Sequence, residues 1–295
     1  VPPSPHPLIS PPALRARKRM RKRDGSAGTR WRGRCVIAWY AESEMTTRRF
    51  EHANNPSFRC SEDVLLLPFG RRSYLPAIVE AYDGEEVALD ETTDRIVYRL
   101  RGARGPVTLL YSGMGSPAAA NAIEMATANG ARRVVVFGAC GGVDDRVEVG
   151  DLIVPYAAVR GEGTSRYYAP SNYPAAFHPF LSARLWLEAH RAADVTAHSG
   201  VVFTTDAGYR QGPELYEEQA GLVLAVESEC AAAAVVGARL GLSVAALLFC
   251  SDNPALPREQ DRLYSGLANG RVCRAFETGL EAVVETLSEA HEWNR

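Results

Sequence analysis

The chain has 295 residues, of which 46% are hydrophobic, so it is long enough to bury a substantial core. It contains no apolar run of about 18 residues that would span a bilayer, and its first 30 residues lack the apolar stretch of a secretory signal. We therefore expect a soluble cytoplasmic protein without a membrane partner. The net charge of −2 hides an asymmetry, because residues 1–34 carry ten Lys or Arg and one acidic residue.

Residues 1–34 are predicted to form a disordered, basic, Pro-rich tail. A Pro-rich start is followed by the basic run Arg15 to Arg23, and neither can bury a core. One interpretation of this run is an arm that binds nucleic acid. The other, which we favour, is a nonessential or translated upstream extension, so nucleic acid is not an expected partner. Residues 35–295 are assigned to one domain.

From Cys35 onward, short β-branched or apolar runs alternate with alanine-rich segments, which predicts an α/β fold with a sheet covered by helices. Strands are predicted at Val64 to Leu67, Arg95 to Leu100, Val107 to Tyr111, Arg133 to Phe137, Leu152 to Tyr156, Gly200 to Phe203, Leu222 to Val226 and Leu242 to Cys250. Helices are predicted at Tyr74 to Ala81, Pro117 to Asn129, Pro179 to Ala193, Pro213 to Ala220, Glu229 to Leu240 and Arg271 to His291.

The six cysteines are widely spaced, and several lie in apolar runs. This pattern favours buried thiols over disulfides or a zinc site, and no metal is expected.

Polar or Gly-rich segments follow five of the predicted strands, where open α/β sheets collect their ligands. They are Ser112 to Gly115, Gly138 to Gly142, Thr204 to Asp206, Glu227 to Glu229 and Ser251-Asp252. We expect them to converge on one pocket.

The first of these segments, Gly113 to Ala118, matches a GxGxxA dinucleotide fingerprint. The next strand lacks the acidic residue that would bind an adenosine ribose, so a dinucleotide-dependent oxidoreductase is disfavoured. The same turn is able to present backbone N–H groups to a phosphate or a sugar hydroxyl.

Three acidic residues in this set each have a structural and a functional interpretation. Glu227 and Glu229 border the start of an alanine-rich helix, where they serve either as helix caps or as acceptors for the vicinal hydroxyls of a ribose. Asp252 ends the most apolar strand, either as a cap for the turn at Asn253-Pro254 or as a carboxyl whose burial raises its pKa so that it can deliver a proton.

The loop from Gly161 to Pro170 mixes glycines, hydroxyls, one Arg and two Tyr. It suits stacking on a planar base and contact with an anion; a subunit contact is the alternative.

In chain order, these motifs resemble the purine nucleoside and uridine phosphorylase superfamily, which includes nucleosidases that use water. The resemblance runs from about Val107 to Leu287. It rests on the glycine turn at Gly138 to Gly142, Val149-Gly150-Asp151, the loop Val159 to Pro170, Thr204 to Asp206 with Tyr209, Val226 to Glu229 (similar to the family's VEME ribose motif) and Ser251-Asp252.

The resemblance implies a mixed central sheet, no cofactor beyond phosphate as co-substrate, a small-molecule nucleoside partner and a homo-oligomer, either a dimer or a hexamer. It also implies a role for each matched position. Catalytic roles fall to Asp252, which protonates the leaving base, and Glu229; ribose binding to Glu227, Ser228 and Glu229; base binding to Thr164, Tyr167, Thr205 and Asp206; and phosphate or water binding to Gly113, Gly138, Arg166 and Arg71.

Departures from the family pattern fall mostly on the phosphate side. The N-terminal GDPxR motif is not recognisable, Pro68 to Arg72 being a loose stand-in. Val136 and Ala139 replace an arginine and a threonine that contact phosphate, and Ser228 replaces a methionine under the sugar. The Gln and Arg that read uracil are not evident around Tyr209 to Tyr216, which favours a purine-like base. We therefore expect phosphorolysis of a purine-like nucleoside, with a hydrolytic nucleosidase as the alternative and a catalytically silent nucleoside-binding protein as a distant third.

Overall fold

The computed structural model describes residues 59–70, 74–90, 95–102, 105–192, 194–256 and 269–289. The described residues belong to one compact unit. The predicted tail, Cys35 and Arg71 lie outside the described residues.

The strands are β1 (Asp63–Leu67), β2 (Glu85–Asp90), β3 (Arg95–Arg101), β4 (Pro106–Tyr111), β5 (Arg133–Gly142), β6 (Leu152–Gly161), β7 (Ala175–Ala176), β8 (Ala197–Thr205), β9 (Ala225–Glu227) and β10 (Ser243–Asp252). The helices are α2 (Leu75–Ala81), α3 (Ser116–Ala128), α4 (Pro179–Arg191), α5 (Pro213–Gln219), α6 (Cys230–Leu240) and α7 (Gly270–Glu289), with short 3-10 turns η1 (Ser165–Tyr167) and η2 (Gly208–Arg210).

The strands form one mixed sheet with the order β10-β6-β8-β9-β5-β1-β4-β3-β2. β10 also pairs in parallel with β5, so β5, β10, β6, β8 and β9 close into a ring. Within it, β9 pairs in parallel with β8 and antiparallel with the end of β5, at Gly141 and Gly142. This register pairs Gly141 with both Asp252 and Val226, and Thr204 with Glu227, so the last residues of β5, β8, β9 and β10 lie side by side.

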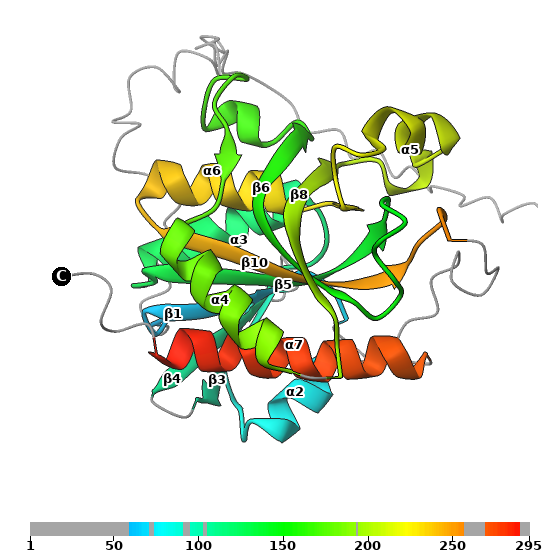
Figure 1. The fold of residues 1–295 in the computed structure, drawn as a ribbon. Helices are drawn as coiled ribbons and strands as arrows, with labels where there is room; N and C mark the ends of the chain where they lie inside the picture. Colours follow the sequence, from blue (N-terminus) through cyan, green and yellow to red (C-terminus); the bar gives the residue numbers. More distant parts are fainter. Residues whose placement is uncertain are drawn as a thin grey trace, which may run out of the picture. The chain divides into compact units, whose positions relative to one another are not determined.

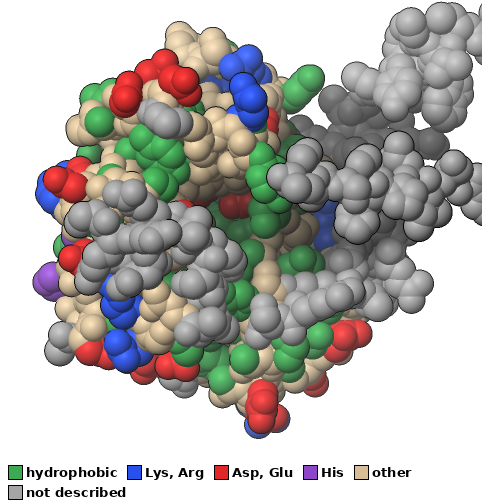
Figure 2. All heavy atoms as spheres, turned by 90° about the vertical axis from the view of Figure 1, so that its right-hand side faces the viewer, with side chains coloured by type: hydrophobic (Ala, Val, Ile, Leu, Met, Phe, Trp, Pro, Cys, Tyr) green, Lys and Arg blue, Asp and Glu red, His purple; other side chains and the backbone are tan. Residues whose placement is uncertain are grey.

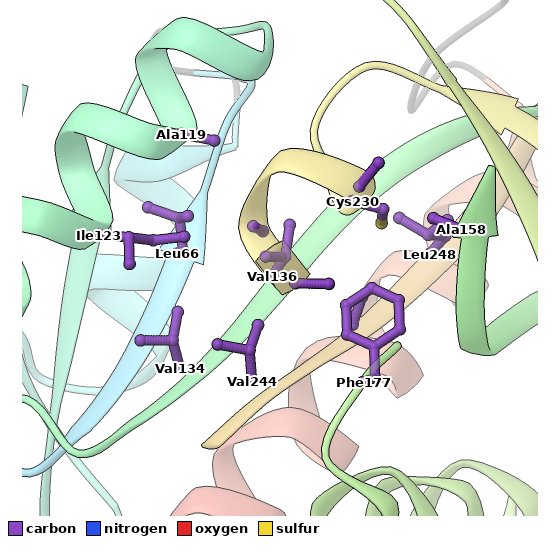
Figure 3. Packing of buried hydrophobic residues seen from close by; sticks show 14 of the residues in the cluster. Leu66, Ala119, Ile123, Val134, Val136, Ala158, Phe177, Cys230, Val244 and Leu248 are labelled. Carbon is purple, nitrogen blue, oxygen red and sulfur yellow. The ribbon is translucent and has the colours of Figure 1, made fainter. Parts of the chain in front are cut away.

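Alternate residues of each central strand face opposite sides of the sheet, and each side is covered by helices (Figure 1). On one side, Val136 and Leu248 pack with residues of α3 and α6, as Figure 3 shows for Ile123 and Cys230. On the other side, Phe137 and its neighbours pack against α2, α4 and α7. The predicted sheet with helices on both faces is confirmed, and the two apolar layers fix the strands whose ends carry the site.

Local sequence signals account for several helix ends. Pro117 lies in the first turn of α3, where its missing N–H costs nothing, and Gly130, just beyond the end of α3, has φ 109°. Gly241 ends α6 in the left-handed conformation with φ 73°, which a residue with a Cβ rarely adopts. Proline in a first helical turn and glycine just beyond a helix end are both favoured at these positions.

β5, β6 and β8 are longer than predicted, and β2 and β7 were not predicted. β5 continues through the glycine turn to Gly142 because β10 pairs with it as far as Gly141. β6 continues to Gly161 because it pairs with β8. β2, with the sequence EEVALD, is too polar to read as a strand and forms against β3 at the end of the strand order.

Five cysteines in the described ranges are free thiols, and Cys140, Cys230 and Cys250 among them are buried. None of the described helices is long and apolar enough to cross a membrane.

Candidate active site

The carboxylate of Glu227 is engaged by protein donors. One oxygen accepts hydrogen bonds from the backbone N–H groups of Glu229, at 2.6 Å, and Cys230, at 2.7 Å. The other accepts from the hydroxyl of Thr204. Glu227 is buried at the end of β9 and supplies acceptors to the first N–H groups of α6. Its position supports the capping interpretation of this residue and fixes the backbone that carries Glu229.

The carboxylate of Glu229 is joined to the glycine turn that follows β4. Its Oε1 accepts a hydrogen bond from Gly115 N at 2.5 Å, and Ser116 Oγ donates to the carbonyl of Ser228 at 2.7 Å. Gly115 has φ 98°, a conformation that suits glycine. The turn that matches a dinucleotide fingerprint therefore serves here to hold the second carboxylate.

Both carboxyl groups have raised pKa values because they are buried close together. Burial, followed by the negative charge of Glu227, raises the pKa of Glu229 to about 8. Burial also raises the pKa of Glu227, against the opposing effect of its hydrogen bond from Thr204. Positive charge that develops on a ligand beside this pair would favour the ionised forms and would itself be stabilised.

Asp252 lies at the end of β10, and burial raises its pKa while a hydrogen bond from Ser251 opposes that rise. Ser251 Oγ is 2.7 Å from Asp252 Oδ1 and 3.1 Å from the carbonyl oxygen of Cys140. The turn beyond β10 is made by Asn253 instead, whose Oδ1 accepts from Ala255 N at 2.9 Å. The capping role considered for Asp252 is thus filled by its neighbour.

Small residues let β10 and β5 approach closely beside Asp252. A Cβ on Gly141 would lie 3.4 Å from Asp252 Oδ2, and one on Gly142 would lie only 2.5 Å from Asn253 Nδ2. Asn253 is fully buried, and its Nδ2 donates to the backbone carbonyls of Asp144 and Val147. The glycine pair therefore fixes where the end of β10 can lie.

The buried thiol of Cys140 lies near both Asp252 of β10 and Glu227 of β9. Burial raises its pKa most, and the charges of Cys250, Asp252 and Glu227 add to the rise. Gly141 pairs with Val226, next to Glu227. Figure 2 views the carboxyl ends of β5 and β10, and this face is hollowed near its centre, with acidic side chains in the depth of the hollow.

The predicted base-side residues lie on two neighbouring segments. Thr164 and Tyr167 belong to the loop after β6, and the side chain of Tyr167 is 91% exposed. Asp206 Oδ2 accepts from Gly163 N at 2.8 Å, and the buried Thr205 accepts from Ala207 N at 3.2 Å. The structure thus brings the two segments together, but Thr205 and Asp206 direct their oxygens at backbone.

The predicted phosphate-side residues are more scattered. Gly113, with φ 77°, has open space where a Cβ would point, next to the turn that binds Glu229. Gly138 is buried inside β5, where a Cβ would contact Leu248 at 3.4 Å. Arg166 is exposed on η1, and Val136 is fully buried in the core. Gly138 and Val136 therefore serve packing.

The segment Val159 to Pro170 resembles the substrate loop of the family's phosphorylases. Sequence reasoning gave no role to two of its charged residues or to one aromatic residue of α5. Arg160 and Glu162 bind the loop from within, and Glu162 is only 1% exposed, which no local pattern signals. Tyr216 of α5 is half-buried, and its pKa is raised first by burial and second by the charge of Asp252.

Within the described part of the chain, no group of three or more His, Cys, Asp or Glu side chains is placed to hold a metal ion.

A family model described as the phosphorylase superfamily matches residues 64–287. The chain belongs to the phosphorylase superfamily. The match extends the resemblance seen in the sequence to the first described strand, so β1 to α7 are one superfamily fold.

Superfamily members with different names are similar to the chain. The uridine phosphorylase of Thermococcus kodakarensis is 34% identical over 146 residues, 49% of this chain and 51% of the relative. The guanosine phosphorylase of Halorubrum lacusprofundi is 32% identical over 149 residues, covering 50% and 61%. The aligned segments thus span about half of this chain and little more of each relative. The solved AMP nucleosidase of Bacteroides thetaiotaomicron has a TM-score of 0.57 and 26% identity, over 76% of this chain and 88% of that one.

Proposed function

We propose that this protein cleaves the N-glycosidic bond of a nucleoside, with phosphate as the nucleophile, to give a free base and ribose 1-phosphate. The observation that carries the proposal is the buried Glu229 carboxylate, held by the amide of Gly115 and set beside Glu227. Such a pair suits the hydroxyls of a ribose, whose anomeric carbon becomes positively charged in the transition state. The related phosphorylases support the nature of the reaction.

In the proposed mechanism, a phosphate oxygen forms a bond to C1′ as the bond from C1′ to the base nitrogen breaks. The bonding electron pair moves into the base, and Asp252 delivers a proton to the base ring, so the base leaves neutral. Burial raises the pKa of Asp252, which favours the protonated form that this step requires. The carboxylates of Glu227 and Glu229 stabilise the sugar while it carries oxocarbenium-like positive charge in the transition state.

We propose a purine-like base because a ring nitrogen that accepts a proton gives Asp252 its role. The relatives include both uridine and guanosine phosphorylases. The expectation that no Gln and Arg lie around Tyr209 to Tyr216 is wrong, because Arg210 and Gln211 are in that range, and Gln211 Oε1 is 3.5 Å from the hydroxyl of Tyr216. The sequence therefore gives no reason to disfavour uracil. A uridine substrate is therefore the comparison that the assay must include.

Hydrolysis is the second candidate, and a specific observation favours it. Val136 is fully buried, and Ala139 carries no polar group, at positions where the resemblance implies an arginine and a threonine for phosphate. The similarity to a solved AMP nucleosidase also supports this alternative. In that case water would attack C1′ and the product would be free ribose.

Product analysis on a panel of purine nucleosides and uridine, with and without phosphate, tests both candidates. Ribose 1-phosphate formed only with phosphate is the expected result. Free ribose at the same rate in both conditions would replace phosphorolysis with hydrolysis. The Glu229→Gln variant, purified identically, measures any contaminating activity.

We further propose that the protein works as a homo-oligomer in the cytoplasm, on the basis of family membership. Light scattering on the purified full chain measures the assembly, and a monomer at assay concentration would contradict it.

A further inference from the structure

The loop that follows β6, residues 161–173, rests on α6 with space beneath it. A cavity of about 270 Å³ lies between the loop and the helix. It is lined by Tyr168, Pro170 and Tyr173 of the loop and by Val235 and Arg239 of α6. Only Tyr168 and Ala169 of the loop pack against the core cluster of that side. Because the cavity lies between α6 and the end of the loop at Pro170 and Tyr173, apolar packing alone does not fix the position of that end.

The guanidinium of Arg160, at the end of β6, makes four hydrogen bonds to this loop. Nε donates to Ser165 Oγ at 2.8 Å. One terminal nitrogen donates to the carbonyls of Pro170, at 2.5 Å, and Tyr173, at 2.7 Å, and the other donates to the carbonyl of Ala169 at 3.1 Å. The planar fork of an arginine suits this set of acceptors, which a lysine ammonium cannot reproduce.

Ser165 passes this contact on to the buried Glu162. Since the guanidinium can only donate, the hydroxyl of Ser165 must accept from Arg160 and give its single proton to Glu162 Oε1. Glu162 Oε2 accepts from Ser165 N at 2.9 Å, so the turn η1 is held at its first residue. The order Arg160, Ser165, Glu162 places a positive and a negative group on opposite sides of one hydroxyl.

The start of the loop is tied to the segment that follows β8, because Asp206 of that segment accepts a hydrogen bond from Gly163 N at 2.8 Å. The close approach of the strands below depends on Gly161, where a Cβ would lie 2.4 Å from Cζ of Phe203. Hydrogen bonds thus hold the loop at Gly163, at Ser165 and at Tyr173.

The geometry points to Arg160 as a positioning residue that holds the substrate loop in its binding conformation through Ser165 and Glu162. Its effect on nucleoside binding rests on the proposed function, because the loop carries Thr164 and Tyr167. Arg160 contacts no reacting group. Without its hydrogen bonds, the loop must be ordered each time a nucleoside binds, so binding weakens while the bond-breaking step changes little.

Amide hydrogen exchange and steady-state kinetics on Arg160→Gln test this role. Exchange of amides in residues 163–173 should rise by about tenfold or more, while amides of β10 keep their protection. KM for the nucleoside should rise about tenfold with kcat within about threefold of the wild type. Arg160→Lys should fall between the two proteins. The matched control is Arg191→Gln, since Arg191 is an exposed arginine paired with Glu188 on the surface of α4.

Unchanged loop exchange in Arg160→Gln would overturn the inference, as would a loss of kcat with KM unchanged. If Arg160→Gln does not fold, Ser165→Ala breaks the same connection and is read in the same way. The exchange experiment needs no substrate, so it stands even if the wild type cleaves no nucleoside, an outcome that would contradict the proposed function alone.

Discussion

The sugar side and the base side of the candidate site are built by different means. On the sugar side, Glu227 and Glu229 are buried and held by backbone N–H groups at the end of a strand inside the closed ring. On the base side, Tyr167 and Tyr209 are fully or almost fully exposed, and the loops are tied down by side chains. Under the proposed function, the sugar chemistry would be set by the core of the fold, and the base would be chosen by segments that can change without disturbing that core.

The largest effect on this comparison is expected from Glu229→Gln. The change prevents the ionisation of Glu229 that a positively charged transition state favours, so kcat should fall by about 1,000-fold with the fold intact. Steady-state kinetics and circular dichroism measure the two quantities. A variant with wild-type kcat would remove Glu229 from the sugar side of the site.

Asp252→Asn should come next, with kcat for an ordinary purine nucleoside lowered by about 100-fold because the leaving base is no longer protonated. A nucleoside with an activated leaving group needs no such proton and should lose less than about threefold. Equal losses on both substrates would assign Asp252 to structure rather than to proton transfer.

Glu227→Ala tests whether the core sets the sugar side. It leaves the N–H groups of Glu229 and Cys230 and the hydroxyl of Thr204 without their acceptor, so the free energy of unfolding should fall by about 2 kcal/mol or more. Denaturant unfolding gives that value. Glu227→Gln keeps an acceptor oxygen and should lose less; if the Ala variant is as stable as the wild type, the hydrogen bonds to Glu227 do not hold the site.

The pH dependence of stability should carry the signature of Glu229. Its pKa in the folded protein is raised from the ordinary value of 4.5 to about 8, so its ionisation opposes folding. The wild type should therefore lose stability relative to Glu229→Gln as the pH rises from about 4.5 to about 8, with no further relative loss above that window. Thermal unfolding of both proteins across this range measures the difference, and parallel curves would show that Glu229 is not perturbed.

Tyr167→Ala should have the smallest effect. An exposed ring that stacks on a base contributes about 1 kcal/mol, so KM should rise about fivefold with kcat unchanged. The effect should differ between purine and pyrimidine nucleosides if the loop reads the base. Identical KM values for every nucleoside in wild type and variant would place Tyr167 outside the base side.

The sequence predicts the strands and helices of the core well because their apolar patterns agree with the packing that the fold imposes. Residues that depend on tertiary contacts are harder to predict. Gly138 to Gly142 read as a turn, yet β10 and β9 pair with this segment and extend it as strand. Glu227 and Glu229 look alike in sequence, and only their hydrogen bonds separate the residue that caps a helix from the one proposed to bind a sugar.

The base side shows the same limit more strongly. Asp206 resembles a base contact in sequence, but its oxygen accepts from Gly163 N on another loop. Arg160 and Glu162 meet through Ser165 because of the way a loop folds back on its own strand, and no spacing rule describes that path.

Ring closure also bears on how this sheet behaves toward other chains. Because β10 pairs with β5 as well as β6, the strand order ends in β2 rather than at two open edges. β2 carries Glu85 and Glu86, and Glu85 pairs with Arg99 of the neighbouring strand. Charges on a terminal strand discourage strand addition and aggregation, so the acidic residues of β2 protect this open edge. Among the described strands, β7 also has a single neighbour, β6, and it is only two residues long.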